Sequence, residues 1–200
     1  MSYKYIIMAA GAGTRWGNYL GVPKHLIEFN GETLLGRTTR LLKENGITDY
    51  VITCSDPRYA QYGPTAEQTK HDCEVDRFEE TLTDGPICYL YGDVFYSENA
   101  IKTIVNTEPD DVLFFGHDWE IFAVKIKDRD LFFSHKNRVK SLFLSGRIGR
   151  CIGWEVYRSM HGIPFIQHII SDRYMKIIDE TDDIDYPYEY EEFKKRVEGK

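Results

Sequence analysis

A glycine-rich loop directly after a short apolar run is the feature that most restricts the fold of this chain. The apolar run, residues 5–8, has the length and residue types of a buried β-strand. The loop after it, residues 9–17, has so little side-chain bulk that its backbone N–H groups can approach an anion or a flat base. Arg15 and Lys24 add two positive charges. The strand, the bare loop and the two cations together predict a polyphosphate site.

Spacing excludes two well-known glycine loops. A Walker A loop ends in Gly-Lys-Ser or Gly-Lys-Thr, and neither Gly13 nor Gly17 leads into such a tripeptide. A dinucleotide-binding loop has the pattern G-x-G-x-x-G, whereas this chain has G-x-G-x-x-x-G with Arg15 inside it. A simple turn between a strand and a helix would also use glycine, but it would not need Arg15, Pro23 and Lys24.

The pattern A-A-G-x-G-T-R-x-G followed by P-K resembles the signature loop of the nucleotidyltransferases that activate sugar phosphates and small phosphorylated alcohols. The resemblance implies an α/β fold, namely a three-layer α/β/α, mostly parallel sheet of the Rossmann-like, GT-A-like nucleotidyltransferase type. It also implies that the loop wraps a nucleoside triphosphate, with Arg15 and Lys24 as the catalytic cations on its phosphates. The nucleotide-binding residues implied in this way are Ala9, Ala10, Gly11, Ala12, Gly13, Thr14, Arg15 and Lys24.

A Gly-Asp pair follows a second predicted buried strand, residues 87–91. In open α/β sheets, ligands bind at the carboxyl ends of the strands, and a carboxylate at that edge suits Mg²⁺. Members of the resembling family carry a metal-binding Asp at this point, which implies that Asp93 binds Mg²⁺. A turn or helix cap is the alternative for Asp93, since Gly-Asp is a common turn pair.

An acidic segment near the C-terminus, residues 179–192, holds eight carboxylates and no cation. The family carries its second metal-binding Asp in a similar phrase, which implies this role for Asp185. Two tyrosines depart from the family pattern, and Asp182 and Asp183 remain rival ligands. A solvated acidic segment is the alternative for most of these side chains.

Length and charge fit one compact enzyme. Two hundred residues with 42% apolar content suit a single α/β domain. Within residues 1–200 we expect three parts: 1–116 to bind the nucleotide, 117–178 to bind the acceptor, and 179–200 to supply the acidic metal segment and a closing helix. The net charge of −7 argues against a nucleic-acid partner.

The lengths of the apolar runs and the spacing of the cysteines indicate where the protein is located and in which state its thiols are. No apolar run approaches the ~20 residues of a membrane span, and the N-terminus has no secretory pattern, so we expect a cytoplasmic protein without membrane contact. The four cysteines share no C-x-x-C spacing, which favours reduced thiols over zinc ligands. Relatives in the resembling family are commonly homodimers, which makes a homodimer the expected assembly.

Strands and helices are expected to alternate, which predicts a parallel sheet. Further strands are expected at 50–54, 112–115, 120–127 and 174–178, the third of them half-buried because it alternates. Helices are expected at 33–45, 97–106 and 163–171, with a short one at 76–82 and a closing one from Pro187.

Acceptor contacts in the resembling family come mostly from the later half of the chain. The candidates there are His117, Arg147, Arg150 and Trp154. Arg147 and Arg150 flank glycines, and a pair of guanidiniums can hold a phosphate bidentately. A solvated arginine or an ordinary packing residue is the alternative for each of the four.

The run of residues 22–52 resembles the small cytidylyltransferases that form CDP-choline or related CDP-alcohols. The length of the chain and its short middle part are similar to those of the capsule-biosynthesis cytidylyltransferases that form CDP-L-glutamine. The resemblance implies an enzyme that uses Mg²⁺ to transfer CMP from CTP to a small phosphorylated acceptor, preferably L-glutamine phosphate, with release of pyrophosphate. Phosphocholine, a sugar 1-phosphate and a molybdenum cofactor stay open as acceptors. A non-catalytic nucleotide-binding regulator stays open as another class.

Overall fold

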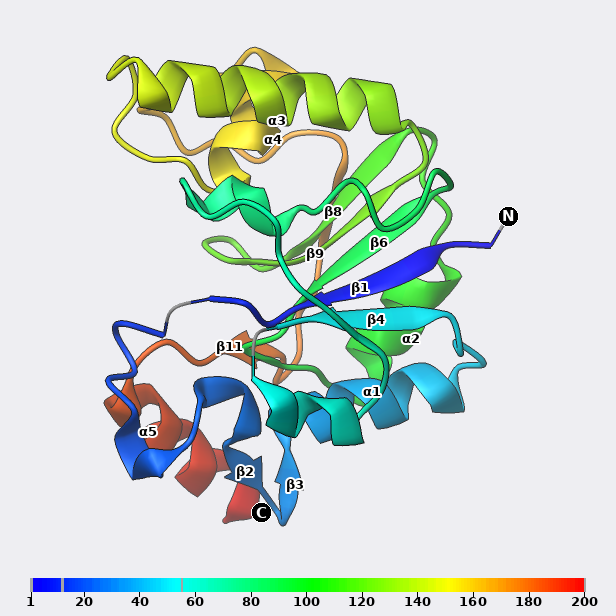
Figure 1. Ribbon diagram of the computed structural model, residues 1–200, viewed down its shortest axis with the longest axis vertical. Coiled ribbons are helices and arrows are strands. Elements are labelled where there is room, and N and C mark those ends of the chain that lie inside the picture. The colour runs from blue at the N-terminus through cyan, green and yellow to red at the C-terminus, as the bar shows by residue number, and fades with distance from the viewer. Residues whose placement is uncertain (1, 12, 55, 200) are drawn as a thin grey trace.

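The computed structural model describes residues 2–11, 13–54 and 56–199. Its centre is a seven-stranded sheet in the order β10-β8-β9-β6-β1-β4-β5 (Figure 1). The strands are β1 (Lys4–Met8), β4 (Tyr50–Thr53), β5 (Thr65–Ala66), β6 (Ile87–Tyr91), β8 (Val112–Gly116), β9 (Ile121–Ile126) and β10 (Tyr174–Lys176). Neighbouring strands are parallel except at β9, which runs antiparallel to both β6 and β8.

Helices cover both faces of this sheet. α1 (Leu34–Glu44) and α2 (Glu98–Asn106) pack on one face, and α3 (Arg129–Leu144) and α4 (Gly153–His161) pack on the other (Figure 1). The predicted three-layer, mostly parallel α/β/α fold is confirmed. No helix in residues 2–11, 13–54 and 56–199 is both long and apolar enough to cross a membrane.

A smaller layer lies beside the sheet. It consists of the hairpin β2 (Glu28–Phe29) and β3 (Glu32–Thr33), the antiparallel pair β7 (Val94–Phe95) and β11 (Asp182–Asp183), and α5 (Pro187–Glu198). The members share a separate apolar cluster, in which Phe29, Phe95 and Phe193 pack ring against ring. This cluster fixes the C-terminal acidic segment against the chain's first third.

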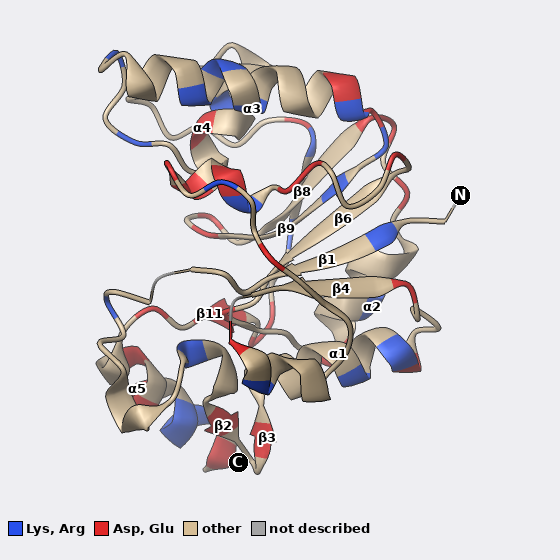
Figure 2. Cartoon of the chain, in the orientation of Figure 1, with Lys and Arg blue, Asp and Glu red and all other residues tan. Residues whose placement is uncertain are grey.

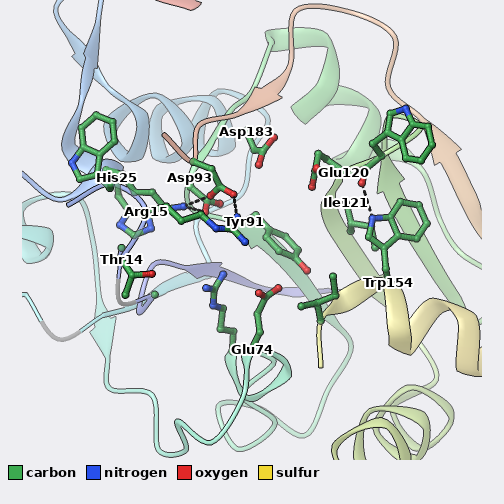
Figure 3. Close-up of a pocket in the computed structure, with 18 of the residues that line it drawn as sticks. Thr14, Arg15, His25, Glu74, Tyr91, Asp93, Glu120, Ile121, Trp154 and Asp183 are labelled. Carbon is green, nitrogen blue, oxygen red and sulfur yellow. Dashed lines mark hydrogen bonds and ion pairs between the residues drawn. The ribbon is translucent and has the colours of Figure 1, made fainter. Parts of the chain in front are cut away.

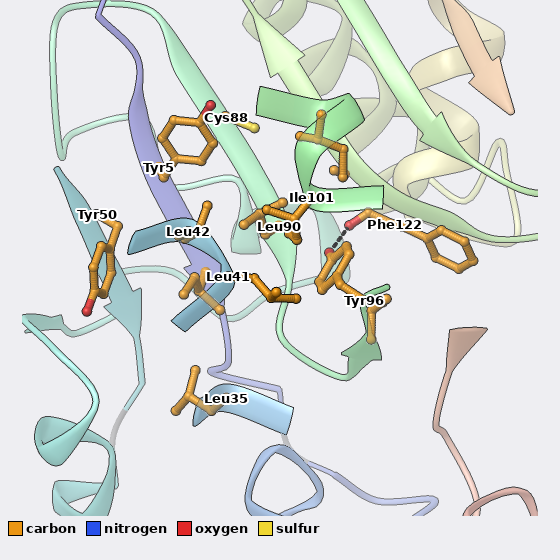
Figure 4. Packing of buried hydrophobic residues seen from close by; sticks show 14 of the residues in the cluster. Tyr5, Leu35, Leu41, Leu42, Tyr50, Cys88, Leu90, Tyr96, Ile101 and Phe122 are labelled. Carbon is orange, nitrogen blue, oxygen red and sulfur yellow. Dashed lines mark hydrogen bonds between the residues drawn. The ribbon is translucent and has the colours of Figure 1, made fainter. Parts of the chain in front are cut away.

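The core under α1 follows from its sequence period. The predicted inward leucines, residues 34, 35, 41 and 42, are all buried. Leu41 and Leu42 meet Tyr5 of β1 and Leu90 of β6 in one apolar cluster (Figure 4). Burial of leucines at helical spacing therefore fixes α1 on the sheet, as the amphipathic pattern predicts.

Side-chain caps set where three helices begin. Thr33 Oγ1 accepts a hydrogen bond from Gly36 N (3.0 Å) at α1, and Ser97 Oγ accepts one from Ala100 N (2.9 Å) at α2. At α5 the Glu189 carboxylate reaches back to accept from the backbone N of Asp185 and of Tyr186. The predicted starts of the second helix at Ser97 and of the closing helix at Pro187 are confirmed.

Two predicted helices are wrong. Residues 163–171 form no helix, because Gly162 ends α4 with a positive φ and Pro164 starts a turn closed by Gln167 N. Residues 76–82 hold only the end of a short 3₁₀ helix, Glu74–Arg77. The predicted half-buried strand at 120–127 is also wrong in its exposure, since all six residues of β9 are buried.

The fold creates a crevice where strand order reverses. From β1 the chain moves outward to β4 and β5, then returns to β6 on the other side of β1. Gly92 N donates to Met8 O (3.0 Å), and a Cβ at position 92 would lie 2.8 Å from that oxygen. Glycine is therefore required just after β6, and the next residue, Asp93, enters the crevice at the carboxyl ends of both strands.

Candidate functional site

A cavity of about 420 Å³ opens at this crevice. Asp93 and Arg15 enter it from one side, Glu74 from another, and Glu120, Ile121 and Trp154 from the side facing Asp93 (Figure 3). Its lining residues are Gly11, Gly13, Thr14, Arg15, Trp16, Lys24, His25, Glu74, Arg77, Tyr91, Asp93, Trp119, Glu120, Ile121, Arg150, Ile152, Trp154, Asp183 and Asp185. Both the predicted nucleotide loop and the predicted acidic segment therefore face one space.

The glycine loop is held open by a buried anchor. Gly13 has φ +58° and Gly17 φ +62°, conformations that favour glycine. Between them the buried Trp16 donates from Nε1 to Val22 O (2.7 Å) and packs edge-on against Tyr190 of α5. This anchor leaves Arg15 on the outer side of the loop, where it reaches the cavity.

A second hollow of about 240 Å³ lies on the other side of the loop. Ala9, Ala10, Gly11 and Gly13 line it together with Tyr59 and other residues. The predicted nucleotide-binding residues thus line one hollow or both. Ala12, which was predicted with them, lies outside the described residues.

Lys24 joins the two predicted metal ligands. Its Nζ lies 2.5 Å from Asp93 Oδ2 and 2.7 Å from Asp185 Oδ1. Arg15 Nη1 contacts the other carboxylate oxygen of Asp185. Lys24 and Asp93 are both buried, while Arg15 is exposed. Arg15, Lys24, Asp93 and Asp185 come from three distant parts of the sequence and form a connected set of ion pairs at the mouth of the glycine loop.

The three candidate metal ligands of the acidic segment, Asp182, Asp183 and Asp185, have different surroundings. Asp182 and Asp183 form β11, red in Figure 2, which pairs with β7 directly after Asp93. Asp182 points to Arg196 Nη2 (3.0 Å) and to His117 Nε2 (3.6 Å) and does not line the cavity. Asp183 and Asp185 do line it. Geometry therefore favours Asp185 over Asp182 as a partner of Asp93.

The buried carboxyl of Asp93 and the partly buried carboxyl of Asp183 have pKa values shifted in opposite directions. Burial alone would raise the pKa of Asp93, but the charge of Lys24, aided by His25 and Arg77, lowers it to about 2. Burial and the neighbouring negative charges of Glu120 and Asp93 raise the pKa of Asp183 to about 8. The cavity floor thus combines a firmly ionised carboxylate with a surplus of negative charge.

Two of the four acceptor candidates line the cavity. Trp154 donates from Nε1 to Trp119 O (2.7 Å) and stacks on Tyr174, with ring centroids 5.5 Å apart. Arg150 is exposed, and its Nη2 lies 3.3 Å from Glu155 Oε1. Arg150 precedes α4, and Trp154 lies in its first turn.

The other two candidates are not among the residues that line the cavity. His117 accepts hydrogen bonds at Nδ1 from the backbone N of Trp119 and of Glu120 (both 3.1 Å), so it shapes a turn outside the cavity lining. Arg147 is exposed in the turn after α3, where its N donates to Leu142 O (2.9 Å).

Several lining residues were missed by sequence reasoning, above all Glu74, Arg77 and Glu120. Glu74 and Arg77 lie three residues apart in a 3₁₀ helix, which places them on one side of it. The spacing of polar and apolar residues in C-E-V-D-R-F was the available signal. Burial raises the pKa of both Glu74 and Glu120.

Comparison with known proteins identifies the first part of the chain. Residues 5–86 match the family model of the MobA-like NTP transferase domain. This segment is therefore similar in sequence to the MobA-like NTP transferase domain. It contains the glycine loop, Lys24 and the segment that carries Glu74 and Arg77, and the predicted nucleotidyltransferase resemblance is confirmed.

A curated relative also matches about a third of the chain. The bifunctional IPC transferase and DIPP synthase of Thermococcus kodakarensis is 39% identical over 71 residues, which are 35% of this chain and 16% of that protein. The chain therefore aligns with about a sixth of this relative's length.

Solved structures extend the similarity beyond residues 5–86 to nearly the whole chain. The inositol-1-phosphate CTP transferase of T. maritima has a TM-score of 0.63 at 15% identity, over 99% of this chain and 97% of that one. CTP:phosphocholine cytidylyltransferase of Streptococcus pneumoniae has a TM-score of 0.65 at 14% identity, over 98% and 100%. At such identities the likeness establishes a shared fold.

Proposed function

We propose that this chain is a cytidylyltransferase that transfers CMP from CTP to a small phosphorylated acceptor and releases pyrophosphate. The observation that carries the proposal is the position of Lys24, whose ammonium contacts both Asp93 and Asp185 at the mouth of the glycine loop. CTP is preferred as donor because the two structural relatives named above are CTP-dependent.

The reaction needs charge control more than proton transfer. An oxygen of the acceptor phosphate attacks the α-phosphorus of CTP, a new P–O bond forms, and the bond to pyrophosphate breaks. A phosphate monoester has a second pKa of about 6, so at neutral pH the nucleophile is already an anion and needs no general base. Arg15 and Lys24 offset the repulsion between the two polyanions and the charge that develops on the leaving group.

The carboxylates of Asp93 and Asp185 fit Mg²⁺, because both reach the same atom, Lys24 Nζ. Mg²⁺ in proteins is typically held by one or two carboxylates, with substrate phosphates and waters as its other ligands. When bound, Mg²⁺ would supply positive charge next to the α-phosphate. Asp93, firmly ionised, and Asp185, held by the backbone contact with Glu189, would be its protein ligands.

For the acceptor we propose L-glutamine phosphate, with phosphocholine as the alternative. Glu74 and Glu120 on the cavity wall suit an ammonium group, and Arg150 suits a carboxylate. A quaternary ammonium prefers a cage of aromatic faces. Here Trp154 already stacks on Tyr174 and Trp119 on His168, which leaves fewer free faces for such a cage.

The test is pyrophosphate release with Mg²⁺ from each of four nucleoside triphosphates and a panel of acceptors. The panel contains L-glutamine phosphate, phosphocholine, phosphoethanolamine and several sugar 1-phosphates. We expect a signal with CTP and one amine-bearing acceptor, and Asp93→Asn as a control should reduce turnover by about 10²-fold or more. CTP binding without turnover for any acceptor would instead support a nucleotide-binding regulator.

A further inference from the structure

One wall of the cavity is a short segment in which the three-residue period of a 3₁₀ helix decides which side chains face the cavity and which are buried. In the 3₁₀ helix Glu74–Arg77, residues three apart share a side. Glu74 and Arg77 line the cavity, whereas Val75 and Phe78 are buried in the core beneath α3. The position of Arg77 at the cavity therefore follows from the burial of its two apolar neighbours.

This segment is held rigidly from several directions. Asp76 accepts hydrogen bonds from Lys140 Nζ (2.8 Å), and Lys136 Nζ donates to Phe78 O (3.0 Å). Val75 N donates to Cys151 O (3.1 Å), which ties the segment to the loop that carries Arg150 and Ile152. Arg77 is thus fixed to the loop that leads to Trp154, on a different segment of the chain from Arg15 and Lys24.

The guanidinium of Arg77 lies over the start of the glycine loop. An ideal Cβ at Gly11 would lie 3.1 Å from Arg77 Nη2, so close that the guanidinium would have to shift by a few tenths of an ångström to accommodate a side chain there. The positive charge of Arg77 contributes to the lowered pKa of Asp93 and opposes the burial that raises the pKa of Glu74. Arg77 therefore acts electrostatically on the cavity from above Gly11.

Arg77 differs from the other cations of the cavity in its partners. Arg15 pairs with Asp185, Lys24 with Asp93 and Asp185, and Arg150 with Glu155. Within residues 2–11, 13–54 and 56–199, no carboxylate oxygen lies within ion-pair distance of Arg77, and none of its side-chain nitrogens donates a hydrogen bond to the protein. A guanidinium that faces a cavity and has no carboxylate partner can bind an anion from solution.

We propose that Arg77 binds the phosphate group of the acceptor, a role that rests on the proposed nucleotidyl transfer. Its planar fork matches two oxygens of a phosphate monoester. Arg15 and Lys24 already lie on or next to the glycine loop where the triphosphate is proposed to bind, while Arg77 reaches the same cavity from the separate 3₁₀ segment. The three cations together place the acceptor phosphate beside the α-phosphate of CTP.

The test separates the acceptor phosphate from the phosphates of the nucleotide. The protein is saturated with Mg²⁺ and α,β-methylene-CTP, which fills the triphosphate site and cannot react, and inorganic phosphate is titrated by calorimetry. Wild type, Arg77→Gln, Arg77→Lys and the control Arg147→Gln, from an exposed turn, are compared. Thermal melting of each variant reports on folding.

We expect Arg77→Gln to weaken inorganic phosphate binding by about tenfold or more, since a charge-assisted hydrogen-bond pair is lost. Arg77→Lys should retain part of the affinity, and Arg147→Gln all of it. The affinity for α,β-methylene-CTP alone should stay within about twofold in every variant. If Arg77→Gln does not fold, the comparison of wild type with Arg77→Lys decides, because lysine keeps the charge but loses the fork.

Equal phosphate affinity in wild type and the Arg77 variants would overturn the proposal, as would the absence of phosphate binding to the wild-type complex. Weaker binding of α,β-methylene-CTP with unchanged phosphate affinity would assign Arg77 to the nucleotide instead. These outcomes do not depend on turnover. Failure of the proposed function is a separate result, namely wild-type protein that releases no pyrophosphate from CTP with any acceptor.

Discussion

The ammonium of Lys24 lies 2.5 Å from Oδ2 of Asp93, and both side chains are buried. Burial alone would lower the pKa of Lys24, but the charges of Asp93 and Asp185 outweigh it and raise the pKa. The pair therefore stays ionised at neutral pH. Each charge depends on the other, because a buried charge without a partner is strongly destabilising.

Lys24→Met is accordingly expected to reduce the free energy of unfolding by about 3 kcal/mol, since it leaves Asp93 buried without its counter-charge. The double variant Lys24→Met with Asp93→Asn should recover part of this loss. Urea denaturation of the two single variants and the double variant measures the coupling. Lys4→Met is the control: Lys4 pairs with the exposed Asp49, and its loss should cost less than about 1 kcal/mol. Equal stability of the single and double Lys24 variants would contradict the coupling.

Replacement of Asp182, Asp183 and Asp185 by asparagine, one at a time, should give three different results. Asp185→Asn should reduce kcat by about 10²-fold, because Asp185 contacts both Lys24 and Arg15. Asp182→Asn should leave kcat near the wild-type value, since Asp182 faces Arg196 outside the cavity lining. Asp183, whose pKa is raised to about 8, is mostly protonated at neutral pH, so Asp183→Asn should change kcat less than Asp185→Asn. The measurement is pyrophosphate release at saturating CTP, and equal mild effects at all three positions would mean that the segment is only solvated.

Glu79 lies two residues after Arg77, and the pH dependence of the free energy of unfolding tests how Glu79 holds this segment. Burial alone would raise the pKa of Glu79, but hydrogen bonds from the backbone N and hydroxyl of Thr69 and of Thr81 lower it to about 2. A carboxyl with a lowered folded-state pKa adds stability above its unfolded pKa of about 4.5. That stability is lost as the pH falls towards about 2, because the unfolded chain binds the proton first.

Glu79→Gln should therefore lower the free energy of unfolding at pH 7 by about 2 kcal/mol, and the difference from wild type should shrink between pH 4.5 and pH 2.5. Urea denaturation of both proteins across this pH range checks the sign. The comparison cancels the titration of all other carboxyls common to both chains. A difference that stays constant with pH would show that Glu79 is not ionised by its threonine contacts.

Sequence predicted those parts of the fold in which the spacing of apolar residues fits only one kind of secondary structure. β1 and α1 have apolar residues at strand and helix spacing, α1 also has a clear N-cap, and both elements lie within a residue or two of the prediction. The glycine loop was informative for a different reason. Gly13 adopts a positive φ and Gly92 leaves no room for a Cβ beside Met8 O, so each glycine has a specific steric cause.

Buried lysines explain two of the failures. Lys125 is buried in β9 because its Nζ donates to the carbonyls of Ile104, Val105 and Thr107 at the end of α2. Lys136 occupies a core position of α3 because its Nζ donates to Phe78 O. Both lysines read as solvent-facing in the sequence, so β9 was predicted as half-exposed and α3 was not predicted. Their partners are distant in sequence, and only the tertiary fold supplies them.

The last prediction concerns the acceptor side of the cavity, where the indole of Trp154 holds the turn that presents Glu120. Trp154→Phe keeps a ring against Tyr174 but loses the hydrogen bond from Nε1 to Trp119 O. We expect the KM for the acceptor to rise about fivefold, which corresponds to the loss of one hydrogen bond of about 1 kcal/mol, with the KM for CTP unchanged. Tyr3→Phe is a matched control, because it removes one hydrogen bond, to Glu108, away from the cavity and should alter neither constant. A rise in the KM for CTP in Trp154→Phe would place this indole on the nucleotide side instead.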